Sequence, residues 1–244
     1  MSIPLINAIF VPQGAEYKAV CQGLSRTNGS RPLVVPIPVG QVPLTRHLER
    51  LQQAGHFLNH PQPRVVLMGL CGGLTPRYSI GDIVLYQGCV YGSNAVTARQ
   101  RECDPQLTAT LYDRLKDKAI LVKALTSDRL IYSAAQKREL GDLYGADVVD
   151  MEGFAALEVL SRAGVKVATI RVISDDSHHN LPDLTSALST DGSLQSLPLA
   201  IGLIRQPIAA VRLIRGALCG LQVLKGVTNF LFAEDTTAPD VHGF

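Results

Sequence analysis

The chain lacks a strong charge of either sign and has no paired cysteine motif. It contains 23 Lys and Arg against 21 Asp and Glu in 244 residues, a formal net charge of +2. Such an even balance argues against a surface that follows nucleic-acid phosphates. The five cysteines are an odd set without a C-x-x-C pair, which argues against a disulfide framework and a zinc site. A reducing, cytoplasmic environment fits these absences best.

The N-terminus lacks the pattern of a targeting segment. No basic region precedes the first apolar run, and Pro4 and Asn7 interrupt that run. We therefore expect neither a signal peptide nor a membrane-spanning helix at this end.

What the chain has is apolar side chains, 46% of its residues, in segments that alternate between strand-like and helical patterns. This alternation predicts an α/β fold in which a mostly parallel central sheet is flanked by helices. We expect one domain, with residues 1–196 forming the α/β part and residues 197–244 a helical C-terminal extension of it. The predicted strands are 3–11, 64–69, 81–90, 120–126, 147–150 and 165–173, with 32–39 as an edge strand or loop. The predicted helices are 14–24, 44–54, 107–115, 134–144 and 152–163.

Three predicted strands end in chemically suggestive residues, in the segments GLCGG (69–73), DME (150–152) and SDD (174–176). Because ligands gather at the carboxyl ends of parallel strands, we expect these segments to meet at one edge of the sheet. GLCGG matches neither the P-loop nor the dinucleotide fingerprint. Its Gly-Gly turn can still present backbone N–H groups to a ligand, and a purely structural tight turn is the alternative.

Glu152 has two interpretations. Acidic residues at a helix N-terminus are favoured by the macrodipole and by unpaired N–H groups, which would make Glu152 a helix-capping residue. A carboxylate at a strand end can instead bind a ligand, because it accepts two charge-assisted hydrogen bonds at once.

Four ordered blocks resemble the nucleoside phosphorylase and nucleosidase superfamily: GLCGGLTPRYSIGDIV (69–84), SDRLI (127–131), VVDMEGFAA (148–156) and IRVISD (170–175). The tail, with STDGSLQSL and IRQPIAAVRLIRGAL, is similar to the hopanoid-associated phosphorylase branch. The resemblance implies the family's α/β fold and cleavage of a purine N-glycosidic bond, with water or phosphate as the second substrate. It implies no cofactor.

The resemblance also implies roles for individual residues. Met151 and Glu152 match the pair that packs beneath the ribose and binds its hydroxyls. Asp175 matches the aspartate that protonates or hydrogen-bonds purine N7. To donate, it must be protonated or share a proton, which burial and a nearby carboxylate such as Asp176 would favour. Glu16 matches the acid that activates water, and a solvated helix Glu is the alternative there. The remaining residues expected to contact substrate are Leu70, Cys71, Gly72, Ser127, Asp128, Leu130, Ile131 and Val149.

The sequence does not decide whether the second substrate is water or phosphate. Relatives that use phosphate often carry an Arg just before the Gly-Gly segment, where this chain has Leu67 and Met68, and Leu70 replaces a common Ser or Thr. The N–H groups of residues 71–73, with Arg26 or Arg31, could still hold phosphate. His178 and His179 are adjacent, without the spacing of metal ligands, so we predict no metal site.

The tail from 197 to 232 is apolar and basic, and Pro207 divides it into two predicted helices. Its positive charges argue against a membrane span. It could lie on an anionic membrane surface or pack on the sheet or on a partner subunit. We expect a homo-oligomer that releases adenine from an adenosyl substrate, with adenosylhopane as the candidate that the branch implies. The alternatives are a soluble methylthioadenosine or S-adenosylhomocysteine nucleosidase and a noncatalytic nucleoside sensor.

Overall fold

A computed structural model describes residues 5–25, 31–55, 61–92, 96–184 and 203–233. Its strands are β1 (Ala8–Pro12), β2 (Leu33–Ile37), β3 (Arg64–Gly73), β4 (Ile83–Tyr91), β5 (Arg99–Glu102), β6 (Ala119–Thr126), β7 (Val148–Asp150) and β8 (Lys166–Asp175). Its helices are α1 (Ala15–Leu24), α2 (Gln41–Gln53), α3 (Pro105–Leu115), α4 (Ala134–Tyr144), α5 (Gly153–Arg162) and α7 (Pro207–Phe232), with a short 3₁₀ turn at Lys116–Lys118.

All eight strands form a single sheet whose middle closes on itself. β3 pairs with β8, β8 with β4, β4 with β6, β6 with β7, and β7 with β3, which makes a ring of five strands. β1 and β2 extend the sheet on one side and β5 on the other. Five of the eight pairings are parallel and three are antiparallel, so the predicted parallel majority is confirmed in a sheet that is mixed.

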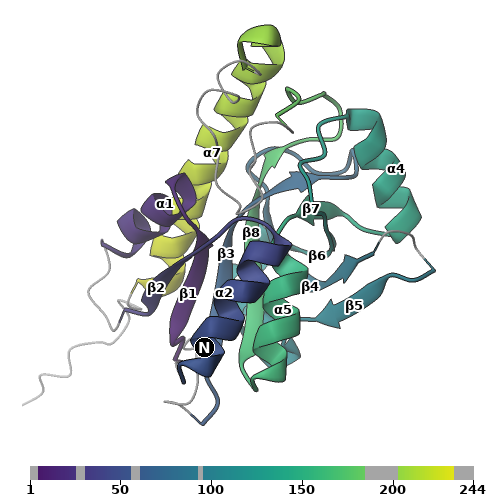
Figure 1. Cartoon of the computed structure of the whole chain (residues 1–244). Helices are drawn as coiled ribbons and strands as arrows, with labels where there is room; N and C mark the ends of the chain where they lie inside the picture. Colours follow the sequence, from purple (N-terminus) through teal and green to yellow (C-terminus); the bar gives the residue numbers. More distant parts are fainter. Residues whose placement is uncertain (1–4, 26–30, 56–60, 93–95, 185–202, 234–244) are drawn as a thin grey trace, which may run out of the picture.

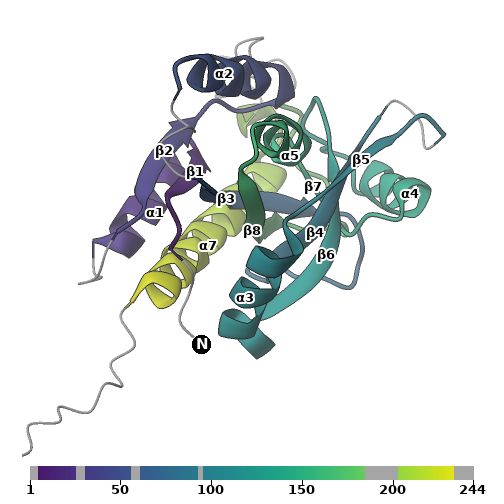
Figure 2. The ribbon, with the colours of Figure 1, turned by 90° about the horizontal axis from the view of Figure 1, so that it is seen from below.

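Helices cover both faces of the sheet, as Figures 1 and 2 show. α2 and α5 pack on one face; α1 and α7 lie side by side on the other. β3 illustrates why both faces are apolar: Val65 and Leu67 point into the α2 and α5 core, while Val66 and Met68 point into the α1 and α7 core. This alternation follows from the two-residue period of a strand. It explains the unbroken apolar run in the sequence.

Two features of the sheet differ from the prediction. β3 was expected to end at Gly69 and continues to Gly73, because β7 and β8 pair with its last residues. β5 was not predicted, since its sequence, RQRE, has no apolar residue to reveal a strand. The proposed boundary between residues 196 and 197 lies outside the described residues.

The predicted helical C-terminal extension is present as α7, which begins at Pro207. Two glycines bring this helix close to the end of β8. A Cβ atom on Gly216 would lie 2.1 Å from the Ser174 carbonyl oxygen, and one on Gly220 would lie 2.9 Å from Leu70 Cδ2. α7 therefore covers the strand end that carries Asp175.

Candidate active site

A buried arginine, Arg171 on β8, organises a group of carboxylates inside the ring of strands. Its Nη2 lies 3.2 Å from Asp150 Oδ2 and 3.2 Å from Glu152 Oε2, and its side chain is 0% exposed. Burial alone lowers the pKa of Arg171, but the carboxylates of Asp150 and Glu152 outweigh burial and raise it. The guanidinium is therefore permanently charged. Among the described residues, its Nε and Nη1 have no hydrogen-bond partner.

Glu152 stands at the N-cap of α5, yet its side chain does not cap the helix. Its Oε1 accepts a hydrogen bond of 3.0 Å from the Gly40 N–H, and its Oε2 faces Arg171. Asp150 accepts from the Gly153 N–H instead, at 3.1 Å, and from the Thr126 hydroxyl at 2.8 Å. The helix-capping interpretation of Glu152 is therefore wrong, and Asp150 takes that role.

The carboxyl group of Glu16, in the first turn of α1, faces the same cluster. Its Oε1 accepts a hydrogen bond of 2.6 Å from the Leu70 N–H. A Cβ atom on Gly69 would lie 2.6 Å from this oxygen and 2.2 Å from Arg171 Nη1, so only glycine fits between the two side chains. Burial raises the pKa of Glu16 to about 7, against the opposing attraction of Arg171. Glu16 is therefore not the solvated helix residue of the alternative interpretation.

Glu152 is only 4% exposed. Burial raises its pKa, and the attraction of Arg171 is the largest opposing effect. Three carboxyl groups, those of Glu16, Asp150 and Glu152, thus surround one guanidinium. The cluster carries a net negative charge whenever more than one of them is ionised.

Asp175 ends β8 and is bound to a lysine that the sequence did not reveal. Lys137, on α4 and 1% exposed, forms an ion pair with Asp175 Oδ1 and donates to the Asp176 carbonyl oxygen at 2.9 Å. The Ser174 hydroxyl donates to Asp175 Oδ2 at 3.0 Å. The Asp176 carboxylate, which was expected to favour a proton on Asp175, binds His179 instead.

Gly72 lies between β7, which leads to Asp150 and Glu152, and the end of β8, which carries Asp175. It pairs with Val149 of β7 on one side and with Asp175 of β8 on the other. A Cβ atom on Gly72 would lie 2.7 Å from Asp175 Oδ1 and 3.3 Å from Val149 Cγ1, so both side chains lie over this glycine. Two strand spacings, roughly 10 Å, separate the backbones of β7 and β8 here. Glu152 and Asp175 therefore lie at the same end of the ring.

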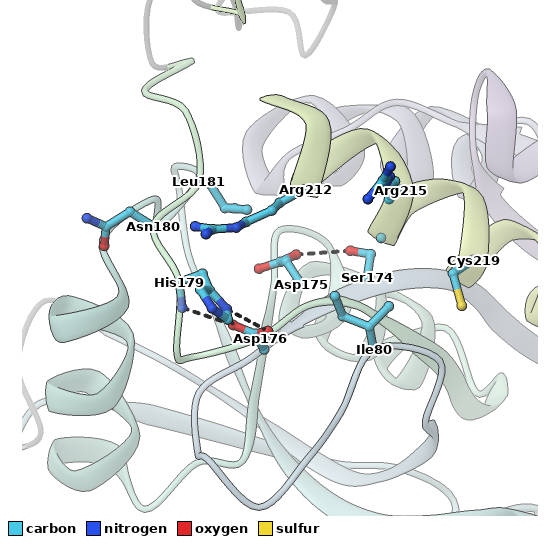
Figure 3. A pocket seen from close by; sticks show the side chains of 11 residues that line it. Ile80, Ser174, Asp175, Asp176, His179, Asn180, Leu181, Arg212, Arg215 and Cys219 are labelled. Atoms are coloured by element: carbon cyan, nitrogen blue, oxygen red, sulfur yellow. Dashed lines mark hydrogen bonds and ion pairs between the residues drawn. The ribbon is translucent and has the colours of Figure 1, made fainter. Parts of the chain in front are cut away.

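A cavity of about 380 Å³ lies between the end of β8 and α7. Figure 3 shows Asp175 on its floor, with Arg212 reaching across from α7 and Leu181 beside it. Ile80 and Arg215 also line it. The volume is within the range of small-molecule sites.

A second cavity, of about 330 Å³, lies beyond the end of β6. Ser127, Asp128 and Ile131 line it, which places three of the predicted substrate residues together. Thr126 lines it as well and donates its hydroxyl to Asp150, so this cavity borders the buried cluster. Leu130 is half-buried and does not appear in its lining.

The other predicted contacts surround the cluster without lining either cavity: Leu70 and Met151 are half-buried, and Cys71, Gly72, Val149 and Glu152 are buried. Burial raises the pKa of the Cys71 thiol, and the carboxylates of Asp150 and Asp175 both add to the rise. Cys71 therefore lies close enough to both Asp150 and Asp175 to interact with their charges. The expected Gly-Gly turn is wrong, because residues 69–73 continue β3.

Arg26 lies outside the described residues, and Arg31 is exposed just before β2. Among the residues that the structure describes, no group of three His, Cys, Asp or Glu side chains could hold a metal ion. His179 Nδ1 lies 3.1 Å from the Asp176 carboxylate.

Comparison with known proteins agrees with this architecture. Residues 10–193 match the phosphorylase superfamily. The fold is similar to that of futalosine hydrolase from Helicobacter pylori (TM-score 0.66, 15% identity, 92% of this chain and 95% of that one). It is also similar to 5′-methylthioadenosine/S-adenosylhomocysteine nucleosidase from Campylobacter jejuni (TM-score 0.63, 14% identity, 93% of this chain and 99% of that one). No curated protein matches the sequence. The family match spans most of the chain, and the sheet closes around the residues that carry the resemblance: the protein belongs to the phosphorylase superfamily of nucleoside phosphorylases and nucleosidases.

Proposed function

We propose that the protein cleaves the N-glycosidic bond of a purine nucleoside and releases adenine from an adenosyl substrate. The observation that carries the proposal is the arrangement around Gly72. Asp175 pairs with this glycine at the end of β8 and has a cavity above it, and Arg171, which binds Glu152, lies earlier on the same strand, paired with Gly69. A nucleoside likewise carries its sugar hydroxyls and its base on separate parts of the molecule.

Glu152 is suited to hold the ribose. Its carboxylate is fixed by the Gly40 N–H and by Arg171, so its orientation does not change when a sugar binds. It accepts hydrogen bonds from two hydroxyls. When the glycosidic bond breaks, positive charge develops on the sugar, and an ionised Glu152 would stabilise that charge.

Asp175 is suited to hold the departing base. Its pairing with Lys137 makes it a hydrogen-bond acceptor: as the glycosidic bond breaks, purine N7 would take a proton from solvent and donate it in a hydrogen bond to Asp175, so that adenine leaves as a neutral base while Glu16 takes the proton of the attacking water. Lys137 and Ser174 fix the carboxylate on both oxygens. We give Lys137 and Ser174 a positioning role.

Water is the acceptor that the geometry supports better. Glu16 has a pKa of about 7, which suits a general base near neutral pH. It already occupies the Leu70 N–H, and residues 71–73 are paired within the sheet, so few backbone donors are left for phosphate. Phosphorolysis is the alternative.

The group beyond the ribose 5′ position has two candidates. The solved relatives include enzymes named for 5′-methylthioadenosine and S-adenosylhomocysteine, which favour a small thioether. The cavity beside α7, with Ile80 and Leu181 in its lining, favours a larger apolar group such as that of adenosylhopane. Homo-oligomerisation and a cytoplasmic location stay predictions.

The test is adenine release from 5′-methylthioadenosine and from a 5′-alkyl-5′-deoxyadenosine, each with and without phosphate. Glu152→Gln should reduce kcat at least about 100-fold, a typical effect of losing one transition-state contact. Glu158→Gln is the matched control, because Glu158 is on the same helix and pairs with Arg101 and Arg162 instead. Release that needs phosphate would favour phosphorolysis. Binding of the nucleoside without adenine release would show a sensor and refute the proposed activity.

A further inference from the structure

α7 is more exposed than a helix of its composition should be. It is long and apolar enough to cross a membrane, yet only 22% of its most apolar stretch is buried. One side packs on α1 and β8 through small or apolar residues, among them Gly216, Gly220 and Leu224. The opposite side faces away from the protein. A core helix would have both sides covered.

The outward side carries a row of large apolar residues, which we name the α7 apolar stripe: Ile208, Val211, Ile214 and Leu218. They are 71%, 48%, 48% and 61% exposed, and Ile204, just before the helix, is 78% exposed. At 100° per residue they fall within a sector about 120° wide and cover a length of about 15 Å. Contiguous apolar surface of this kind marks an interaction site.

All the charged side chains of α7 are basic. α7 contains no acidic residue, and Arg212 and Arg215 are exposed along its Ile208 edge. Further along the helix, Lys225 and Lys18 of α1 line a groove between the two helices. An apolar face bordered by arginines and lysines is the pattern of a helix that lies in the interface of an anionic bilayer.

A second copy of the chain is the competing occupant, and the charges disfavour it. In a two-fold contact the same patch of both copies is buried, which would place Arg212 and Arg215 of both copies, four arginines, in one interface. Anionic lipid headgroups supply the opposite charge, and long arginine side chains reach the headgroups while the apolar side chains enter the acyl region. Spanning the bilayer is incompatible with the packing of α7 on α1 and β8.

We infer that the α7 apolar stripe, with Arg212 and Arg215, docks the protein on an anionic membrane surface. The same two arginines line the cavity above Asp175, so docking places that cavity next to the bilayer (Figure 3). The inference rests on the surface of α7 alone. It would stand even if the protein had no nucleosidase activity.

Cosedimentation of the full chain with vesicles tests the inference. Binding is expected to phosphatidylcholine vesicles with 30% phosphatidylglycerol, to be weaker on pure phosphatidylcholine, and to fall as NaCl is added. The double variant Arg212→Gln/Arg215→Gln should lower the partition coefficient about 30-fold, at about fivefold per arginine. Ile208→Asp/Leu218→Asp should abolish binding.

Leu143→Asp is the matched control, because Leu143 is 52% exposed on α4, away from α7. It should bind vesicles like the wild type. Thermal unfolding checks that each variant is folded, and the arginine variant and the salt series test the inference if the aspartate variant unfolds. Absence of binding to anionic vesicles, or full binding by the folded Ile208→Asp/Leu218→Asp variant, would overturn it. The inference would also be overturned if the wild type bound no vesicles and formed a dimer in ultracentrifugation that the Ile208→Asp/Leu218→Asp substitutions dissociate.

Discussion

Replacing Arg171 by Met should destabilise the protein in a pH-dependent manner. Arg171 is the cation between Asp150 and Glu152, 3.2 Å from each, and is 0% exposed. Removing one partner of a buried ion pair leaves uncompensated charge and costs about 3–5 kcal/mol. For a chain of this size that corresponds to a fall in Tm of roughly 6–20 °C.

The sign of the pH dependence follows from the carboxyl groups left behind. Arg171 lowers the pKa of Glu16 and of Glu152, so its loss raises both. In the variant these groups take up protons on folding, and this contribution to stability is lost as pH rises through their pKa values. The destabilisation should therefore be smaller at pH 5 than at pH 8.

Urea unfolding at pH 5, 6.5 and 8 measures this effect. Arg77→Met is the control: its side chain is 70% exposed and pairs with Asp147 at 2.8 Å, an exposed pair worth at most about 1 kcal/mol. An equal loss of stability for both variants would contradict the account of the cluster. So would a loss for Arg171→Met that is the same at every pH.

Three further predictions follow from single side chains. The pKa of Glu16 rises from 4.5 to about 7 through burial, so Glu16→Gln should gain stability over the wild type as pH rises through this range, by roughly 3 kcal/mol at pH 8 in urea unfolding. Asp175→Asn should lower kcat for adenine release about 100-fold with little change in substrate Kd; full turnover would rule out its role. Gly216→Ala should lower the free energy of unfolding by about 1–3 kcal/mol, because the added Cβ atom would meet Ser174. Gly226→Ala, where the added atom would lie in open space, should raise it by up to about 1 kcal/mol. Equal effects of the two substitutions in calorimetry would contradict the packing of α7.

Apart from β5, the order of strands and helices could be predicted, because the apolar residues of each element recur with the period of a strand or of a helix. Residues 134–144 are the clearest case, since Ser133 caps α4 and Gly145 ends it in the left-handed conformation. The closure of the sheet could not be predicted. It depends on the antiparallel pairing of β3 with β7 and of β4 with β8, and no local pattern encodes which strands meet.

The candidate site was predictable where a residue follows a strand. Asp175 ends β8 beside Gly72, and Glu152 follows β7 and binds Arg171 of β8. Arg171 and Lys137 were missed for opposite reasons. Arg171 lies in the apolar run ATIRVIS, where a lone charge was the available signal, and Lys137 lies on a polar helix that reads as solvent-exposed.

The most direct test of the central claim is a crystal structure of the protein with 5′-methylthioadenosine bound to the slow Asp175→Asn variant. The account predicts the ribose hydroxyls within hydrogen-bonding distance of Glu152 and purine N7 within hydrogen-bonding distance of residue 175. A nucleoside bound elsewhere, or with its base at Glu152, would contradict it.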